Sequence, residues 1–163
     1  MNYITIYKTS LVDGVGWRTV IFVSGCDHKC PGCHNVQSWD SNAGRPFTEE
    51  TKKLIYDQML SDQIDGITFS GGDPLYKTNI DEVTKFCKEF KEKFPNKTIW
   101  LYTGSLYEDI KSLEVMSYVD VVVDGPFILE KRDTTIPFRG STNQRIFNVK
   151  YDREIYKLKE TTT

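Results

Sequence analysis

Residues 19–35 read TVIFVSGCDHKCPGCHN and combine two structural signals in one stretch. The first six residues form a continuous apolar, β-branched run, which is typical of a strand covered on both faces of a sheet. Three cysteines follow at once, Cys26, Cys30 and Cys33, separated by three and then two residues. The sequence therefore predicts a buried strand that leads directly into a loop carrying three thiols.

This cysteine loop offers three thiol ligands, one fewer than most closed metal sites contain. A structural zinc site normally has four protein ligands, and a ferredoxin-type 4Fe-4S cluster is normally held by four cysteines. The remaining cysteine, Cys87, lies far downstream among apolar residues at helical spacing, so we interpret it as a core residue. Three thiolates on a cluster leave one iron open to a small molecule. Alternatively, His28 or His34 could complete a zinc site, or the thiols could be an incidental buried group.

Length, charge and composition restrict the class of protein. The chain of 163 residues is expected to form a single domain over residues 1–163. With 21 basic and 23 acidic residues, its net charge of -2 gives no indication of binding to nucleic acid or to a membrane surface. No signal-peptide pattern or apolar stretch of about 20 residues is present. We therefore expect a cytoplasmic protein, in which clustered cysteines more often bind metal than form disulfides.

Strand and helix signals alternate along the rest of the chain. Three successive strand-helix-strand units predict parallel strands with right-handed crossovers. The units are too few for a closed eightfold barrel, which typically needs about 250 residues. The expected fold is α/β, an open partial (β/α) barrel with a parallel sheet and flanking helices. The predicted strands are residues 3–7, 19–24, 66–70, 98–103 and 118–124, and the predicted helices are roughly residues 47–61, 79–94 and 106–113, the second opening with Asn79 and Glu82 in a capping-box pattern.

Loops rich in glycine and aspartate follow the predicted core strands. In parallel sheets, functional loops lie at the carboxyl ends of the strands, so these loops should face one site together with the cysteine loop. Gly71 and Gly72 lack a Cβ, so their backbone can approach a ligand closely, although an ordinary turn would have the same composition. Asp124 is interpreted either as a turn-former or as a contact to a ligand or ion. The loops are Gly71-Gly72-Asp73-Pro74, Tyr102-Thr103-Gly104 and Asp124-Gly125-Pro126-Phe127.

The spacing Cys-x3-Cys-x2-Cys after an apolar strand resembles the signature of the radical S-adenosylmethionine (radical SAM) superfamily. Within that superfamily, residues 13–18 (DGVGWR) and Cys33-His34-Asn35 are similar to the activases of glycyl-radical enzymes. Two positions depart from the superfamily pattern: Gly32 stands where an aromatic residue is frequent, and Asp73 stands where many members carry glutamate. Residues 69–75 (FSGGDPL), 123–127 (VDGPF) and 138–145 (FRGSTNQR) resemble, more narrowly, the activases of anaerobic ribonucleoside-triphosphate reductases.

The resemblance implies a set of cofactors and site residues. A 4Fe-4S cluster would be held by Cys26, Cys30 and Cys33, and its open iron would be chelated by the methionine part of S-adenosylmethionine. No catalytic residue is implied beyond these cluster ligands. The implied contacts to S-adenosylmethionine are Gly71, Gly72 and Asp73 for the methionine amino group, His34 for the adenine, Thr103 for the ribose, and Gly32, Cys33 and Asp124 as further candidates.

The resemblance also implies a reaction and its partners. One electron from the cluster would cleave S-adenosylmethionine to methionine and a 5'-deoxyadenosyl radical, which would abstract a hydrogen atom from a glycine Cα. That glycine would belong to the C-terminal loop of the large subunit of an anaerobic ribonucleoside-triphosphate reductase, and an external donor such as flavodoxin would supply the electron. Trp17, Trp39 and residues 137–141 are candidate partner contacts, with core packing as the alternative for each tryptophan.

Two other classes of protein would share part of this pattern. A different small radical SAM enzyme, similar to pyruvate formate-lyase activase or to a deazapurine synthase, would carry the same cluster. A zinc-binding interaction module would keep the three thiols and a histidine but would have no use for S-adenosylmethionine. Metal content and transfer of a hydrogen atom from a reductase peptide would distinguish these alternatives.

Overall fold

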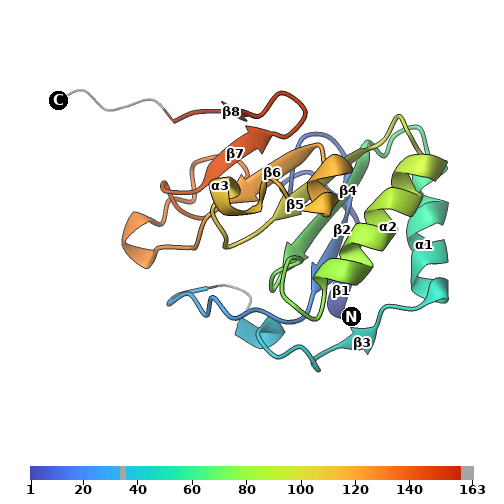
Figure 1. Ribbon diagram of the computed structural model, residues 1–163, viewed down its shortest axis with the longest axis horizontal. Helices are drawn as coiled ribbons and strands as arrows, with labels where there is room; N and C mark the ends of the chain where they lie inside the picture. Colours follow the sequence, from blue (N-terminus) through green and yellow to red (C-terminus); the bar gives the residue numbers. More distant parts are fainter. Residues whose placement is uncertain (34–35, 159–163) are drawn as a thin grey trace.

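One mixed sheet runs through the molecule (Figure 1). The computed structural model describes residues 1–33 and 36–158, and within them eight strands follow the order β3-β1-β2-β4-β5-β6-β7-β8. The four central strands are parallel, which confirms the α/β class and the parallel pairing expected from the sequence. These strands are β2 (Arg18–Val23), β4 (Gly66–Gly71), β5 (Thr98–Tyr102) and β6 (Val121–Asp124).

Antiparallel strands extend the sheet on both sides of the parallel centre. On one side, β1 (Asn2–Ser10) pairs with β2, and the two-residue β3 (Arg45–Pro46) pairs with β1. The sequence predicted a short edge strand over residues 3–7, so β1 is longer than expected and lies one place inside the edge. On the other side, β7 (Arg145–Asn148) and β8 (Arg153–Ile155) were not predicted, because segments of four and three residues are too short for a clear alternating pattern.

Two long helices cover one face of the sheet. Helix α1 (Glu49–Met59) begins after the N-cap Thr48, as predicted, and α2 (Ile80–Lys93) lies beside it, with the Tyr56 and Phe86 rings stacked at 5.6 Å (Figure 1). The third predicted helix is shorter than expected. Only α3 (Tyr107–Ile110) is α-helical, and i to i+3 bonds then tighten the chain into the 3-10 turn η2 (Glu114–Ser117). Two further 3-10 turns are η1 (Val36–Ser38) and η3 (Leu129–Lys131).

The predicted capping box at the start of α2 is wrong. The Asn79 side chain makes no cap hydrogen bond. Its buried amide instead donates to the carbonyl oxygens of Ser24, at 2.8 Å, and Asp73, at 3.0 Å. The Glu82 carboxylate lies 2.8 Å from the amino group of Met1. Asn79 therefore connects the loops after β2 and β4, because two buried carbonyl groups there need a donor.

The main hydrophobic core lies between the sheet and the two long helices. Alternation along β5 divides its side chains: Ile99 and Leu101 belong to this core, while Trp100 belongs to a smaller cluster and Tyr102 packs against that cluster. Cys87 is fully buried on α2, which confirms its interpretation as a core residue. No helix in the described ranges is long and apolar enough to cross a membrane.

A buried arginine closes the end of the sheet at which the parallel strands begin. Arg18 is 1 % exposed, and its guanidinium donates to the side chain of Thr68 and to the carbonyl oxygens of Ile67 and Thr98 at 2.7–2.9 Å. Burial lowers the pKa of Arg18 to about 10, but the group stays charged at neutral pH. Arg18 therefore connects β2, β4 and β5, and leaves the opposite end of the sheet for the site.

Candidate functional site

A cavity of about 650 Å³ lies on the face of the sheet opposite α1 and α2. Ser70 and Tyr102 line it, and along their strands these residues alternate with Phe69 and Leu101 of the helix-covered core. The loops at the carboxyl ends of the four parallel strands contribute to its wall, as the sequence predicted. Their lining residues include Cys26, His28, Cys30, Cys33, Gly71, Gly72, Thr103, Gly104, Gly125 and Phe127.

All three cysteines of the cysteine loop are half-buried in the wall of this cavity. The start of the loop is fixed by backbone bonds, from Gly25 N to Ser38 O at 2.6 Å and from Cys26 N to Trp39 O at 3.2 Å. Burial raises the pKa of the Cys26 thiol, while the backbone amides of His28 and Lys29 act in the opposite direction.

The thiols face one cavity without forming a site for a single ion. In the described part of the chain, no three His, Cys, Asp or Glu side chains are placed to hold a metal ion together. In a cluster, each thiolate binds a different iron, so its ligands need not converge on one point. Soft thiolates that line a common cavity therefore fit an iron-sulfur cluster.

Gly71 and Gly72 bring the loop after β4 against β2 and the cysteine loop. Gly71 has a φ of +100°, and a Cβ there would lie 2.6 Å from the backbone N and O of Val23. A Cβ on Gly72 would lie 2.5 Å from Gly25 O. Only glycine fits at these two positions, and the close approach places both residues beside the thiols in the cavity wall.

Asp73 lies behind this wall with a side chain that has several protein partners. The residue is 2 % exposed, and its carboxylate accepts hydrogen bonds from Thr103 Oγ1 at 3.0 Å, Gly104 N at 3.0 Å and Leu75 N at 2.9 Å. His28 Nε2 lies 2.8 Å from Asp73 Oδ2, and this hydrogen bond raises the pKa of His28. The structure thus directs His28, one of the two alternative zinc ligands, toward Asp73.

Gly32 does not belong to the wall of the cavity. Among the described residues of its loop, Cys33 lines the cavity, while Gly32 is exposed. Gly32 has a φ of +75°, and a Cβ there would meet the Leu129 side chain at 2.8 Å. The turn and the contact with Leu129 account for glycine at this position, and the candidate cofactor contact of Gly32 stays a prediction. The predicted contact of His34 with adenine lies outside the described residues.

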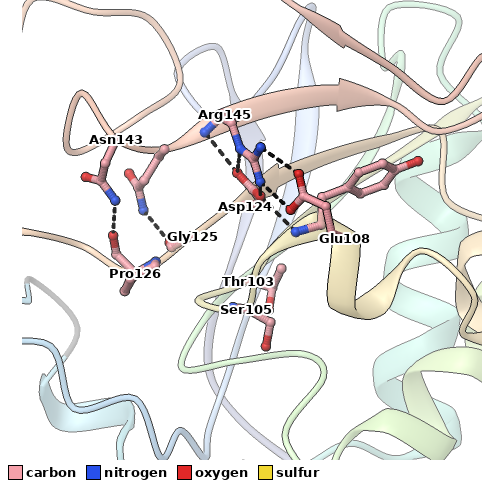
Figure 2. A network of polar contacts seen from close by, with 10 residues as sticks. Thr103, Ser105, Glu108, Asp124, Gly125, Pro126, Asn143 and Arg145 are labelled. Carbon is pink, nitrogen blue, oxygen red and sulfur yellow. Dashed lines mark hydrogen bonds and ion pairs between the residues drawn. The ribbon is translucent and has the colours of Figure 1, made fainter.

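Asp124, another predicted ligand contact, is fully buried and lies outside the cavity lining. Figure 2 shows its contacts with Arg145. Its Oδ2 accepts from Tyr107 N at 2.8 Å and Arg145 Nη2 at 2.6 Å, and its Oδ1 accepts from Arg145 N at 3.0 Å. Arg145 also donates twice to Glu108, both times at 2.7 Å. The carboxylate therefore connects α3, β6 and β7, and the predicted ligand contact of Asp124 stays a prediction.

Side chains next to Asp124 fix the loop that follows β6. Asn143 Nδ2 donates to Pro126 O at 2.8 Å, and Gln144 Nε2 donates to Gly125 O at 3.0 Å (Figure 2). Thr103 Oγ1 accepts from Ser105 N at 3.1 Å while it donates to Asp73. The FRGSTNQR segment thus fixes the loop after β6, and its residues Phe138, Arg139, Gly140 and Gln144 also line the cavity.

Two segments of the cavity wall were not assigned to the site from the sequence. Residues 11–13 follow β1, and residues 134–136 follow η3, and neither segment follows a parallel strand. The usual rule for locating sites at the carboxyl ends of parallel strands therefore misses them.

The candidate partner contacts differ in their surroundings. Trp17 is exposed, and Trp39 lines the cavity with an Nε1 that has no partner among the described residues. Phe138 lines the cavity as well and contacts Trp100, with ring centroids 5.3 Å apart.

Comparison with known proteins agrees with this arrangement of thiols. Residues 12–147 match the family model described as a 4Fe-4S single cluster domain. The fold and the site thus define an iron-sulfur protein with one cluster.

The most similar relatives define the family more narrowly. The anaerobic ribonucleoside-triphosphate reductase-activating protein of Enterobacteria phage T4 is 45 % identical over 149 residues, which cover 91 % of this chain and 94 % of the relative. Proteins of the same name from Pasteurella multocida and Escherichia coli K12 are 39 % and 37 % identical, over 90 % and 92 % of this chain and 97 % and 100 % of their own lengths. The chain belongs to the family of anaerobic ribonucleoside-triphosphate reductase-activating proteins.

Proposed function

We propose that this chain is a radical SAM activase, which generates a glycyl radical on an anaerobic ribonucleoside-triphosphate reductase. The observation that carries the proposal is the cavity in which three half-buried thiols lie beside Gly71 and Gly72. Membership of the activating-protein family adds the identity of the reductase as the partner. The activity is that of an oxidoreductase with a polypeptide substrate.

Cys26, Cys30 and Cys33 are the proposed ligands of a 4Fe-4S cluster with one open iron. When bound, the cluster supplies the electron that cleaves S-adenosylmethionine. Gly71 and Gly72 would place the methionine part next to the thiols, because their backbone lies in the cavity wall. Thr103 would face the ribose from the same wall, and Asp73 would hold Thr103 in place through their 3.0 Å hydrogen bond.

We propose that the mixed sheet is an open partial (β/α) barrel of the radical SAM type. The antiparallel strands β1 and β7 flank the parallel centre, and the segments around residues 11–13 and 134–136 line the same cavity. The loop of the reductase that contains the target glycine would enter between these two segments. A side entrance suits a polypeptide substrate, which cannot be enclosed like a small molecule.

The rim of this entrance would contact the reductase. Leu11, Val12 and Trp17 are exposed apolar residues of the loop after β1, and apolar and aromatic side chains are frequent in the centre of protein interfaces. Pro137 and Phe138 line the cavity on the other side. We further propose that the protein acts in the cytoplasm with a low-potential donor such as flavodoxin, without nucleic acid or membrane.

The test is anaerobic reconstitution with iron and sulfide, followed by electron paramagnetic resonance of the reduced protein. The expected result is a cluster signal that changes when S-adenosylmethionine is added and is absent in C30A. Addition of the reductase should then produce a glycyl radical doublet. Deuterium placed at the target glycine should appear in 5'-deoxyadenosine, which distinguishes this function from that of a radical SAM enzyme with a small-molecule substrate. Stoichiometric zinc without a cluster would contradict the proposal.

A further inference from the structure

The ring of His28 lies so close to Gly104 that a Cβ at position 104 would collide with it. A Cβ on Gly104 would lie 2.6 Å from Cδ2, 2.7 Å from Cγ and 2.9 Å from Nε2 of His28. Such distances are far below van der Waals contact. Gly104 is not among the glycines with positive φ, so its backbone conformation is open to other residues. The contact with the ring is therefore what requires glycine at this position.

Asp73 holds the same ring at its Nε2 atom. His28 Nε2 lies 2.8 Å from Asp73 Oδ2, an oxygen that also accepts from Thr103 and from Gly104. With Leu75 N on Oδ1, four donors share the carboxylate. Three of these donors meet Oδ2, which offers about two lone-pair sites, so this oxygen is fully used by protein groups. The Asp73 side chain is thus committed to holding neighbouring loops, His28 included.

We propose that His28, clamped between Gly104 and the Asp73 carboxylate, is a positioning residue that fixes the cysteine loop in its working conformation. His28 lies between Cys26 and Cys30, so the clamp connects this loop to the loops after β4 and β5. Asp73 then acts on the site indirectly, through His28 and Thr103. The effect on a bound cluster rests on the proposed function, whereas the clamp itself does not.

The backbone around His28 shows why the loop needs such an attachment. Lys29, the next residue, has a φ of +47°, in the left-handed region that is costly for a residue with a side chain. The amides of His28 and Lys29 also act on the sulfur of Cys26. Hydrogen bonds to sulfur are one of the factors that set the reduction potential of a cluster. Fixing the ring therefore fixes two amides that stabilise a proposed cluster ligand.

The clamp also accounts for the aspartate at position 73. A glutamate would extend the carboxylate by one methylene toward the imidazole, which already lies at hydrogen-bond distance. The short acid and the histidine therefore fit together as a pair, with Gly104 making room for the ring. In this chain, aspartate in place of the glutamate that is frequent in the superfamily is explained by its hydrogen bond with His28.

The first test uses the apoprotein, so that it is independent of any cluster. Amide hydrogen exchange of residues 26–30 is measured in the wild type, H28A, G104A, H28Q and the double variant H28A/G104A. H28A and G104A should accelerate exchange about tenfold or more. The double variant should match H28A, because G104A acts through the ring alone. H28Q, whose amide can donate to Asp73, should recover part of the protection.

Two outcomes would overturn the clamp. One is exchange in H28A that equals the wild type, and the other is a G104A effect that persists at full size in the H28A background. Thermal unfolding of each variant checks that the whole fold is retained. If G104A fails to fold, the comparison of H28A with H28Q decides alone.

The second test measures the consequence for a cluster after anaerobic reconstitution. H28A and G104A should bind less iron and sulfide per chain than the wild type, and the cluster that remains should titrate at a more negative potential. Unchanged content and potential would contradict a role for the clamp at the cluster. If the wild type itself binds no cluster, the proposed function fails, while the exchange results on the apoprotein still decide the clamp.

Discussion

Asp73 lies after β4 and Asp124 is the last residue of β6, and the sequence predicted both as candidate contacts to a ligand. In the structure, the two aspartates differ in their hydrogen-bond partners and therefore in their roles. Asp73 accepts from residues in the wall of the cavity, whereas Asp124 is neutralised by Arg145 behind it. His28 lies 45 positions before Asp73, and Arg145 lies 21 positions after Asp124. A local pattern cannot show which of two buried aspartates receives a distant cation.

Arg18 illustrates the same limit for a motif. The segment DGVGWR resembles a segment of the glycyl-radical-enzyme activases, but the resemblance predicts no role for its arginine. In the structure, this arginine on β2 is buried and donates hydrogen bonds to residues near the beginnings of β4 and β5. The three cysteines behave differently, because their spacing is local, and the structure brings all of them to one cavity as the sequence suggested.

The four cysteines provide a prediction at the scale of single residues. C26A, C30A and C33A should each lose most of the iron and sulfide bound after reconstitution, because each removes one proposed ligand. C87A should retain the cluster, since Cys87 is fully buried in the core on α2. It should cost about 1 kcal/mol of folding stability through the small void it creates. Iron and sulfide assays and urea unfolding measure the two effects separately.

The opposite pattern would contradict the assignment of the ligands. A variant at Cys26, Cys30 or Cys33 that keeps the normal iron content would remove that cysteine from the proposed ligands. Loss of iron in C87A would contradict the interpretation of Cys87 as a core residue.

Among the elements, α3, β6 and β7 are held together by one arginine. Glu108 on α3 is 57 % exposed, yet its bidentate hydrogen bond with Arg145 lowers its pKa to about 2. Because this pKa is below the value of an unfolded chain, near 4.3, the pair stabilises the fold above that pH. The stabilisation is lost progressively as the pH falls from about 4.3 toward 2.

E108Q should therefore lower the midpoint temperature of unfolding at pH 7 by about 1–3 °C, since an exposed ion pair contributes little. The difference from the wild type should shrink below pH 4.3. Thermal unfolding between pH 7 and pH 3 measures it. E92Q, on the exposed face of α2, is the control and should show no comparable change. A difference for E108Q that stays constant down to pH 3 would disprove the role of its charge.

The loop between β1 and β2 is built to present apolar side chains at the rim of the cavity. Its backbone is anchored, because Asp13 O accepts from Thr68 Oγ1 at 2.7 Å and Trp17 N donates to Asp65 at 3.0 Å. Leu11 and Val12 lie directly before these anchors and remain exposed. A fixed loop loses little conformational freedom when a partner covers it, which favours binding.

V12S should weaken the activation of the reductase by about 1 kcal/mol, roughly fivefold in apparent affinity, through lost apolar contact. Cleavage of S-adenosylmethionine in the absence of the reductase should not change. L60S is the matched control, because Leu60 at the end of α1 is 74 % exposed and Val12 is 73 % exposed. The yield of glycyl radical at varied reductase concentration measures the effect. Equal behaviour of V12S and L60S would exclude this rim as a contact.

Prediction of the elements succeeded where the pattern is long and local. The four parallel strands and both long helices were expected from apolar runs and periodic spacing, and the structure confirms them. The short strands β3 and β7 depend on neighbours distant in the sequence, as when Ile146 pairs with Val123. Strand β8 has only three residues and pairs with β7, which directly precedes it. The same dependence explains the unexpected wall residues 134–136, whose position follows from the whole sheet.

On the scale of the whole molecule, the hydrophobic core and the cysteine loop are separate. Apart from Cys87, no cysteine belongs to the described core between the sheet and the long helices. Removal of iron by a chelator should therefore leave the far-ultraviolet circular dichroism spectrum nearly unchanged. Residues 25–44 should become more sensitive to proteases, because a ligand that crosslinks the loop is lost. Limited proteolysis with mass spectrometry locates the cleavage sites, and cooperative unfolding on chelation would contradict the separation.

The open cavity has one further consequence, which concerns dioxygen. An entrance that admits the proposed polypeptide substrate would also admit a diatomic gas, and the three thiols in the cavity wall are only half-buried. Neither the sheet nor the rim can act as a filter at that size. The proposed cluster would then be protected from dioxygen only while another molecule fills the entrance. The bound reductase would therefore protect its own activase from oxidation.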